Sequence, residues 1–223
     1  MKAIKAYTQI YGELDGQEIL KKIEKIGRTC YKSEGKIKDD SAEKFVAGLI
    51  KRGHEAMLEH ESITIKFVVD RGISHELVRH RLASFAQEST RYCNYGKDDF
   101  GSEITFIIPE YLSNKTEQWK VWKEAMKTCE DAYFKLLDIG FMPQEARAVL
   151  PNSLKTEVVM TANLREWRHF FKLRAANTTG KAHPQMLEVT RPLLDELKQY
   201  IPVVFDDITY EEGENALKER ERV

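Results

Sequence analysis

The segment ITIKFVV, residues 63–69, carries the clearest structural signal in the chain. Apolar side chains at every second position alternate there with Thr64, Lys66 and Val68. A period of two is typical of a β-strand that buries one face. Residues 154–162, LKTEVVMTA, are rich in β-branched side chains and form a second strand candidate. The two segments together predict a sheet with one face turned towards a hydrophobic core.

Helices are predicted on both sides of these strands in the sequence. Apolar residues at helical spacing predict helices over 17–27, 41–53, 114–139, 143–150, 164–176 and 184–200, and two more strands are expected at 2–11 and 103–108. Gly27 and Gly140 are placed to end two of the helices. Because strands and helices are mixed without strict β-α-β alternation, we expect an α+β fold in which helices flank a largely antiparallel sheet.

Composition excludes several classes of protein. The 223 residues carry a formal net charge of −1, and they include three scattered cysteines, too few and too far apart for a disulfide framework or a cysteine-rich zinc site. The near-neutral charge argues against nucleic acid or a membrane surface as a partner, and no apolar run is long enough to span a bilayer. We therefore expect a cytoplasmic protein without a metal site. We take 1–223 as one domain whose charged end, 211–223, frays.

The segment 71–95, RGISHELVRHRLASFAQESTRYCNY, concentrates the residues that can do chemistry. It holds four arginines, Arg71, Arg79, Arg81 and Arg91, but no lysine, in a chain that is otherwise rich in lysine. The planar guanidinium matches two phosphate oxygens at once, whereas an ammonium group is a point charge. This pattern indicates an anionic ligand held in a fixed geometry. Structural ion pairs to the neighbouring carboxylates are an equally good interpretation at this point.

Ser74 is a suitable N-cap for a helix in this segment. A helix that begins there would carry Leu77 and Phe85 on one apolar stripe, with Arg81 inside the stripe. A buried guanidinium is costly, so this position predicts either a ligand or a buried partner carboxylate. Beyond the helix, the polar run that ends in Arg91 could form a phosphate cradle from a hydroxyl, a guanidinium and backbone N–H groups.

Arg79-His80-Arg81, followed after seven residues by Ser89, is an R-H-R-x7-S motif. The chain thereby resembles the flavin-dependent thymidylate synthases, the ThyX family. Four further blocks agree in order and rough spacing, and the resemblance covers about residues 28–205: GHEAMLEH at 53–60, QEARAVLP at 144–151, NLREWRHF at 163–170 and KLRA at 172–175.

The resemblance implies a methyltransferase of dTMP biosynthesis. Members of the family make dTMP from dUMP, with methylenetetrahydrofolate as carbon donor and with FAD carrying reducing equivalents from NADPH. FAD would be the bound cofactor, and NADPH and the folate would be co-substrates. The resemblance also implies an antiparallel sheet flanked by helices, and a homotetramer whose active sites are shared between subunits.

The resemblance also assigns roles to individual positions. Contacts with dUMP fall on Glu76, Leu77, Val78, Arg79, Gln87, Glu88, Ser89, Thr90, Arg91, Arg147 and Arg174. Contacts with the flavin fall on Ala56, Ser62, Arg79, His80, Arg81, Gln87, Asn163, Leu164, Arg165 and His169. Arg174 would ionise N3 of the uracil, because a fixed cation lowers the pKa of a weak acid beside it. Ala56 stands where relatives often carry Thr or Ser, so a hydrogen bond to the flavin is absent there or comes from another group such as Ser62.

Other candidates in the sequence are weaker. Ser89 and Cys93 could be nucleophiles, but no histidine base is evidently paired with Ser89, and a lone cysteine beside tyrosines is more often structural. The spacing of His54 and His60 does not match the H-E-x-x-H zinc motif. Gln185 and the nearby His183 lie in a segment longer than in many relatives and are left without an assigned role, although either could reach the flavin.

Two other functions fit part of the pattern. An RNA- or nucleotide-binding module could stack bases on Tyr92 and Tyr95, but it would need a broad basic face that the net charge does not supply. A flavoprotein oxidase could use the flavin positions alone, but it would not require Arg91, Arg147 and Arg174.

Overall fold

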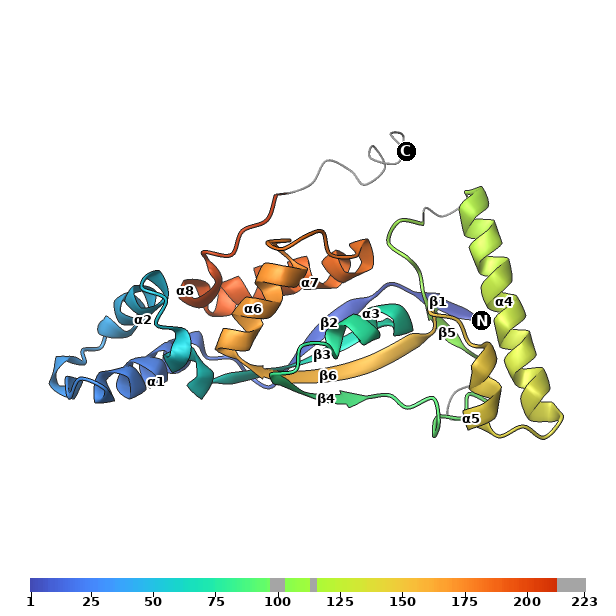
Figure 1. Cartoon of the computed structure of the whole chain (residues 1–223), viewed down its shortest axis with the longest axis horizontal. Coiled ribbons are helices and arrows are strands. Elements are labelled where there is room, and N and C mark those ends of the chain that lie inside the picture. Colours follow the sequence, from blue (N-terminus) through green and yellow to red (C-terminus); the bar gives the residue numbers. More distant parts are fainter. Residues whose placement is uncertain (97–102, 113–115, 212–223) are drawn as a thin grey trace.

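The centre of the molecule is a four-stranded antiparallel sheet in the order β2–β3–β6–β4. The computed structural model describes residues 1–96, 103–112 and 116–211. The sheet consists of β2 (Tyr7–Tyr11), β3 (Ser62–Asp70), β6 (Lys155–Asn163) and β4 (Ala83–Gln87). Helices flank this sheet, so the expected α+β fold class is confirmed (Figure 1).

Alternation of side chains along β3 and β6 gives the sheet one buried and one open face. Ile63, Ile65 and Phe67 are almost fully buried, and Val158, Met160 and Ala162 of β6 lie in the same core. The intervening side chains form polar pairs on the open face, such as Thr64 with Thr161, whose hydroxyl oxygens lie 2.8 Å apart. The period of two seen in residues 63–69 is therefore the feature that orients the sheet.

The covered face carries α3 (Arg71–Leu77), α6 (Leu164–Arg174) and α7 (Pro184–Tyr200) (Figure 1). At one end of the sheet lie the helices of the first third of the chain and the short last helix, with two 3₁₀ turns: α1 (Gly16–Thr29), α2 (Ser41–Lys51), α8 (Pro202–Phe205), Glu34–Lys36 and Glu55–His60.

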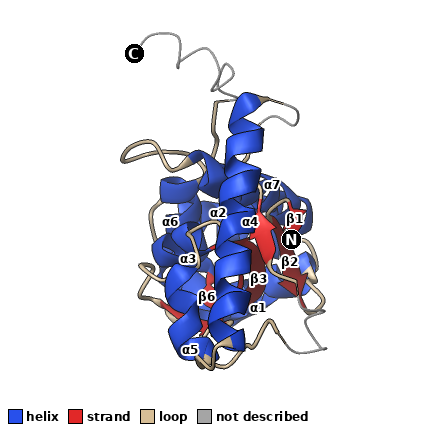
Figure 2. Ribbon diagram, turned by 90° about the vertical axis from the view of Figure 1, so that its right-hand side faces the viewer, coloured by secondary structure: helices blue, strands red, loops and turns tan. Residues whose placement is uncertain are grey.

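The opposite end is formed by the long helix α4 (Glu117–Asp138), which lies in front in Figure 2. It packs beside α5 (Pro143–Ala146), the 3₁₀ turn Arg147–Val149 and a parallel pair of short strands, β1 (Lys2–Ile4) and β5 (Thr105–Ile107). Two hydrophobic clusters correspond to this division. The larger lies between the sheet and α6–α7 around Trp167, and the smaller packs under α4 around Tyr133.

The helix expected to begin at Ser74 is placed differently. Asp70 is the N-cap, and its carboxylate accepts a hydrogen bond from the N–H of Ile73 at 2.9 Å, so α3 begins at Arg71. Gly72 fits this cap because a Cβ there would lie 2.9 Å from the Asp70 oxygen. The helix ends at Leu77, and the chain then turns into strand β4.

This early end of α3 removes the predicted apolar stripe. Phe85 lies in β4, while Leu82 is 77% exposed. Arg81 is exposed rather than buried, so the expectation of a buried guanidinium at this position is wrong.

Three smaller expectations also differ from the structure. Gly27 does not end the first helix, because it lies inside α1 against the ring of Phe45. Residues 2–11 form two strands that join different sheets rather than one strand. The charged tail lies outside the described residues, apart from Glu211. None of the helices in the described ranges is both long enough and apolar enough to cross a membrane.

Among the residues that the structure describes, the buried guanidinium belongs to Arg168, in the middle of α6. Its side chain is 1% exposed and makes a two-pronged ion pair with Asp207 at 2.6 and 2.7 Å. It also donates to Glu55 at 3.0 and 3.1 Å and to the carbonyl oxygen of Val204. Arg168 thereby joins the 3₁₀ turn Glu55–His60, α6 and the segment after α8.

The Asp207→Ala substitution tests this joint. It removes one of the two carboxylates that pair with the buried Arg168 guanidinium. Glu55 remains as a partner and Asp207 is half-exposed, so the loss is moderate. We expect the free energy of unfolding at pH 7 to fall by about 2 kcal/mol in urea denaturation. Asp206→Ala, at the exposed neighbour, is the matched control and should change it by less than about 0.5 kcal/mol. Equal unfolding midpoints for the two variants would contradict a stabilising role of the Arg168–Asp207 ion pair.

The same pair predicts a pH dependence. The hydrogen bond from Arg168 holds the pKa of Asp207 below its ordinary value. A depressed carboxyl pKa contributes stability that is present above the unfolded pKa and is lost as the pH falls through the folded one. The stability difference between the unmodified chain and Asp207→Ala should therefore shrink below about pH 4. A difference that stays constant down to acid unfolding would contradict this origin.

Candidate active site

Two strand-to-helix turns bring the catalytic candidates together. β3 runs into α3 and β6 runs into α6, and the two strands are antiparallel neighbours with Ser62 opposite Asn163 and Asp70 opposite Lys155. The two helices therefore start at opposite ends of the sheet and run back over it towards each other. Arg174, the last residue of α6, meets Glu76 near the end of α3.

The Arg174 guanidinium is held by a residue of α3 and by one of the connection that follows it. Its Nη1 donates to Oε2 of Glu76 at 2.7 Å, and its Nε donates to Nε2 of His80 at 3.2 Å. Nη2 lies 3.5 Å from the carbonyl oxygen of Glu76. A guanidinium has five N–H donors, so both Nη atoms keep donors for another molecule. The sequence-predicted residues Glu76, His80 and Arg174 thus form one cluster.

The hydrogen bonds also fix the protonation of His80. Arg174 can only donate, so Nε2 of His80 accepts, and the ring proton of the neutral imidazole sits on Nδ1. Nδ1 lies 3.2 Å from Oε1 of Glu166, which accepts that proton. Burial lowers the pKa of His80, and the neighbouring Glu166 carboxylate opposes this shift without reversing it. His80 is therefore a neutral residue with a defined tautomer at pH 7.

His80, Glu166 and the exposed His169 also approach the geometry of a metal site. Their potential ligand atoms lie within 4.8 Å of one another, and two imidazoles with a carboxylate are a common zinc set. A metal ion on Nδ1 of His80 would leave the ring proton on Nε2, where it would face the N–H of Arg174. The hydrogen bonds therefore favour a proton over a metal ion between His80 and Glu166.

Gln87 lies at the end of β4 and points towards α3 rather than into the loop that follows. Its amide nitrogen donates to Ser74 at 2.9 Å and lies 3.4 Å from the hydroxyl of Thr156. The Arg71 guanidinium reaches the same hydroxyl and the carbonyl oxygen of Glu88, both at 3.3 Å. This network fixes the position at which the loop leaves the sheet.

Gln185, which the sequence left without a role, supports the site from α7. Its buried amide donates to Oδ2 of Asp70 at 2.6 Å, while Oδ1 of the same carboxylate caps α3. Burial raises the pKa of Asp70. The pair connects α7 to the start of the helix that carries Glu76. No local pattern predicts it, because its two members are 115 positions apart in sequence.

The loop after β4 meets the 3₁₀ turn that carries Arg147. Nη1 of Arg147 donates to the hydroxyl of Thr90 at 3.1 Å, and Nε of Arg91 donates to the side-chain oxygen of Gln144 at 3.0 Å. Both arginines are exposed, and both of these partners are uncharged. Ser89 accepts the backbone N–H of Arg91 at 3.3 Å, which bends the loop. The arrangement presents two positioned positive charges without neutralising them.

The Glu88 carboxylate already has two hydrogen-bond partners within this chain. Its carboxylate accepts from Lys155 at 2.9 Å and from the Tyr95 hydroxyl at 3.1 Å. The pair is largely buried, with side-chain exposures of 13% for Glu88 and 20% for Lys155. The Glu88 side chain therefore anchors the loop, and its backbone is also engaged, because its N–H donates to the carbonyl oxygen of Glu157 at 2.9 Å.

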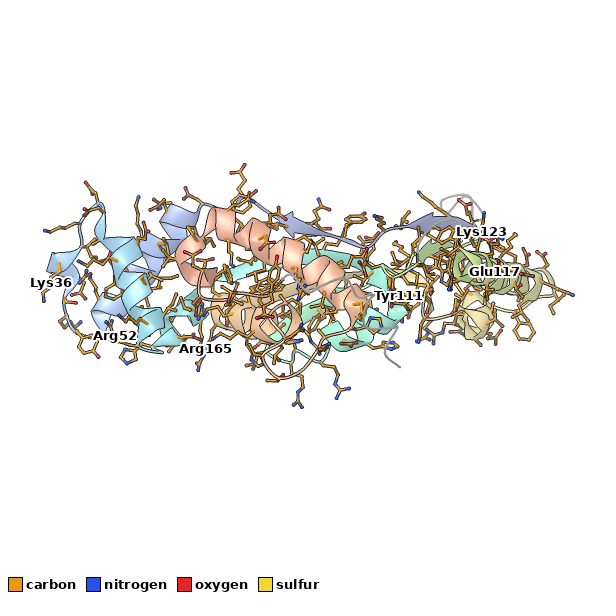
Figure 3. All side chains as sticks on the ribbon, turned by 90° about the horizontal axis from the view of Figure 1, so that it is seen from above. Lys36, Arg52, Tyr111, Glu117, Lys123 and Arg165 are labelled. Carbon is orange, nitrogen blue, oxygen red and sulfur yellow. The ribbon has the colours of Figure 1, made fainter. Side chains whose placement is uncertain are left out.

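A third group of predicted residues lies at the other end of β3 and β6. Ser62 and Asn163 are cross-strand partners, and the Asn163 side chain caps α6 by accepting a backbone N–H at 2.9 Å. Arg165, in the first turn of α6, lies at the surface (Figure 3) and pairs with Glu59 at 2.5 Å. Ala56 is exposed in the adjoining 3₁₀ turn. These flavin candidates form a cluster separate from Arg174.

The remaining predicted residues divide by exposure. Arg79 and Arg81 are exposed, and within the described part of the chain neither guanidinium has a hydrogen-bond or ion-pair partner. Leu77 and Leu164 are buried in the larger hydrophobic cluster, so their side chains cannot contact a ligand. Val78 is 37% exposed beside Arg79.

Comparison with known proteins gives a consistent result. Residues 15–203 match the model of the family described as thymidylate synthase complementing protein. The chain is 34% identical to the flavin-dependent thymidylate synthase of Geobacter sulfurreducens over 187 residues, which are 81% of this chain and 78% of that protein. It is 34% identical to that of Pyrococcus furiosus over 172 residues, 77% of this chain and 68% of the relative.

A solved structure with the same fold is the UMP/dUMP methylase PolB from Streptomyces cacaoi bound with 5-Br dUMP. It has a TM-score of 0.75 and 22% sequence identity, and the match covers 92% of this chain and 96% of that one. At this identity the likeness concerns the fold.

Substitutions at Asp70 test the support from α7. Asp70→Ala removes the cap of α3 and the acceptor of the Gln185 amide, and we expect it to lower the free energy of unfolding by about 2 kcal/mol in urea denaturation. Asp70→Asn keeps an oxygen for the cap and removes a buried charge, so it should cost less than about 1 kcal/mol at pH 7. Equal losses for the two variants would contradict the capping role.

Proposed function

Because the chain belongs to the thymidylate synthase complementing protein family, we propose that it converts dUMP to dTMP as a flavin-dependent thymidylate synthase. The membership expected from Arg79-His80-Arg81 and Ser89 is thereby confirmed. The relatives' shared name supports a flavin cofactor and a methyl-transfer reaction. The observation that carries the proposal is the Arg174 guanidinium, held by Glu76 and His80 with donors to spare.

We assign Arg174 to the pyrimidine of dUMP. The N3–H of uracil is a weak acid, and a fixed guanidinium beside it favours the anion. Glu76 and the neutral His80 hold one side of the guanidinium, so it pays little ordering entropy when a ligand arrives. The anionic ring is electron-rich at C5, which is where the carbon unit must be added.

Arg91 and Arg147 fit the phosphate of dUMP. The uncharged oxygens of Gln144 and Thr90 position the two guanidinium groups, but they leave each positive charge uncompensated. Planar guanidinium groups bind phosphate oxygens two at a time. The cradle expected from the sequence therefore has an electrostatic basis in these two pairs.

The cations around the site fit a flavin dinucleotide. FAD carries a diphosphate, and the exposed guanidinium groups of Arg79 and Arg81 have no described partner that would compete for it. Arg165 and Asn163 could hold another part of the cofactor, although Glu59 competes for Arg165. The bound flavin would supply the hydride for the reaction. We assign NADPH and methylenetetrahydrofolate to the roles of reductant and carbon donor.

We further propose a homotetramer with shared sites. The dUMP candidates lie in two groups, Glu76 with Arg174 and the loop that holds Arg91. Leu82 and Tyr92 are each 77% exposed, which favours burial against another subunit.

The three cysteines are unpaired, which fits a reducing compartment such as the cytoplasm.

Absorbance and tritium release test the reaction. The purified protein should show flavin absorption bands and should release tritium from [5-³H]dUMP when NADPH and methylenetetrahydrofolate are both present. An RNA-binding module would fail both measurements, and an oxidase would show the bands without tritium release. A colourless protein that neither takes up FAD nor acts on dUMP would end the proposal.

The Arg174→Ala variant should retain the flavin bands and lose tritium release by at least about 100-fold. The reason is that the removed cation stabilises charge that develops on the substrate, and such interactions contribute about 3 kcal/mol. Arg174→Lys keeps the charge but lacks the planar donors, so it should recover only part of the rate. Normal turnover by Arg174→Ala would exclude the assigned role.

Arg91→Ala should weaken dUMP binding by about 2 kcal/mol, roughly 30-fold, in isothermal titration calorimetry. The loss should shrink as salt is added, because the lost contact is electrostatic. Arg52→Ala, at an exposed arginine just after α2, is the control and should leave the affinity unchanged. Unchanged affinity in Arg91→Ala would contradict the phosphate cradle.

A further inference from the structure

We propose that Glu166 is a positioning residue that fixes the His80 tautomer and, through it, the orientation of the Arg174 guanidinium. The inference rests on the proposed function only for the role of Arg174. Its structural part concerns three side chains in a row, in which Glu166 accepts from Nδ1 of His80 at 3.2 Å and Nε2 of His80 accepts from Nε of Arg174 at 3.2 Å.

The start of α6 holds Glu166 in place. It lies in the first turn of α6, where the partial positive charge of a helix N-terminus stabilises a carboxylate. Its own N–H is bound by Asn163 at 2.9 Å, which fixes the backbone. The residue is 6% exposed and His80 is 5% exposed, so bulk water cannot replace the hydrogen bond between them.

Without Glu166 the Nδ1 proton of His80 would lose its buried acceptor, and only the contact with Arg174 would then favour this tautomer. The alternative tautomer places a proton on Nε2, which would face the N–H of Arg174 and turn an attractive contact into a repulsive one. The guanidinium would then keep only its contacts with Glu76. The Glu166 carboxylate thus acts on Arg174 through His80.

The charged groups that face His80 give a direction for its pKa. Glu166 and His169 face it from α6, as does Arg174 at the end of that helix. Glu76 from α3 lies beyond Arg174, and the edge contact with Phe170 is apolar. Burial lowers the pKa of His80 and the Glu166 carboxylate raises it. Removal of the carboxylate should therefore lower the pKa of His80 further, whereas local unfolding would raise it towards its ordinary value.

Long-range ¹H–¹⁵N correlation spectra of ligand-free protein labelled with [¹⁵N]histidine test the tautomer directly. The chain has six histidines, and a His80→Asn variant identifies the signal of His80. We expect the proton on Nδ1 in the unmodified chain and in Glu166→Gln, whose amide oxygen can still accept it. In Glu166→Ala we expect a mixture of tautomers. A proton on Nε2 in the unmodified chain, or an unchanged tautomer in Glu166→Ala, would overturn the proposal.

Turnover measures the effect on Arg174. At saturating dUMP, kcat for tritium release should fall about tenfold in Glu166→Ala and should recover largely in Glu166→Gln. Glu24→Gln is the matched control, because Glu24 is also a buried carboxylate with charged and hydroxyl partners, Arg28 and Ser41, but lies in α1 away from the site. It should leave kcat and the His80 tautomer unchanged.

The two measurements separate the inference from the function. A mixed tautomer without a fall in kcat would overturn the link to Arg174. If the unmodified chain had no activity on dUMP while its spectra showed the expected tautomers, the proposed function would fail and the structural part of the inference would stand.

Discussion

The site depends on one interaction, the hydrogen bonds that hold the Arg174 guanidinium between Glu76 and His80. These residues meet because β3 and β6 are antiparallel neighbours and each continues into a helix that returns over the sheet. Side-chain caps from Asp70 and Asn163 set where these helices begin. A shift of either helix by one residue would turn its end by about 100° and separate the pair.

The arginines differ in the partners that hold their guanidinium groups. Arg168 is buried and fully compensated by carboxylates, so it joins elements of the fold. Arg91 and Arg147 are exposed and held by uncharged oxygens, which orient a cation without cancelling its field. Arg174 lies between these cases, with one carboxylate and one neutral imidazole. We therefore assign ligand binding to the arginines whose positive charge is positioned but not neutralised.

Much of this arrangement could be predicted from sequence. Alternation in residues 63–69 and the R-H-R-x7-S motif gave the strands and the family, because both signals are local. The helix expected from Ser74 was wrong because Asp70 caps earlier and Leu77 ends the helix. Because α3 ends before Arg81, this arginine is exposed, and the buried arginine is Arg168 instead. Gln185 and Glu166 were not predicted as supports of the site, because their partners lie 115 and 86 positions away. Such contacts are made by the tertiary fold and leave no periodic signal.

A crystal structure of the chain with FAD and 5-bromo-dUMP would test most directly whether the guanidinium groups converge on one nucleotide. Arg174 should then contact the pyrimidine while Nε remains on His80, and the phosphate should lie against Arg91 and Arg147. A nucleotide bound elsewhere, or a pyrimidine that Arg174 does not touch, would contradict the assignment of the site.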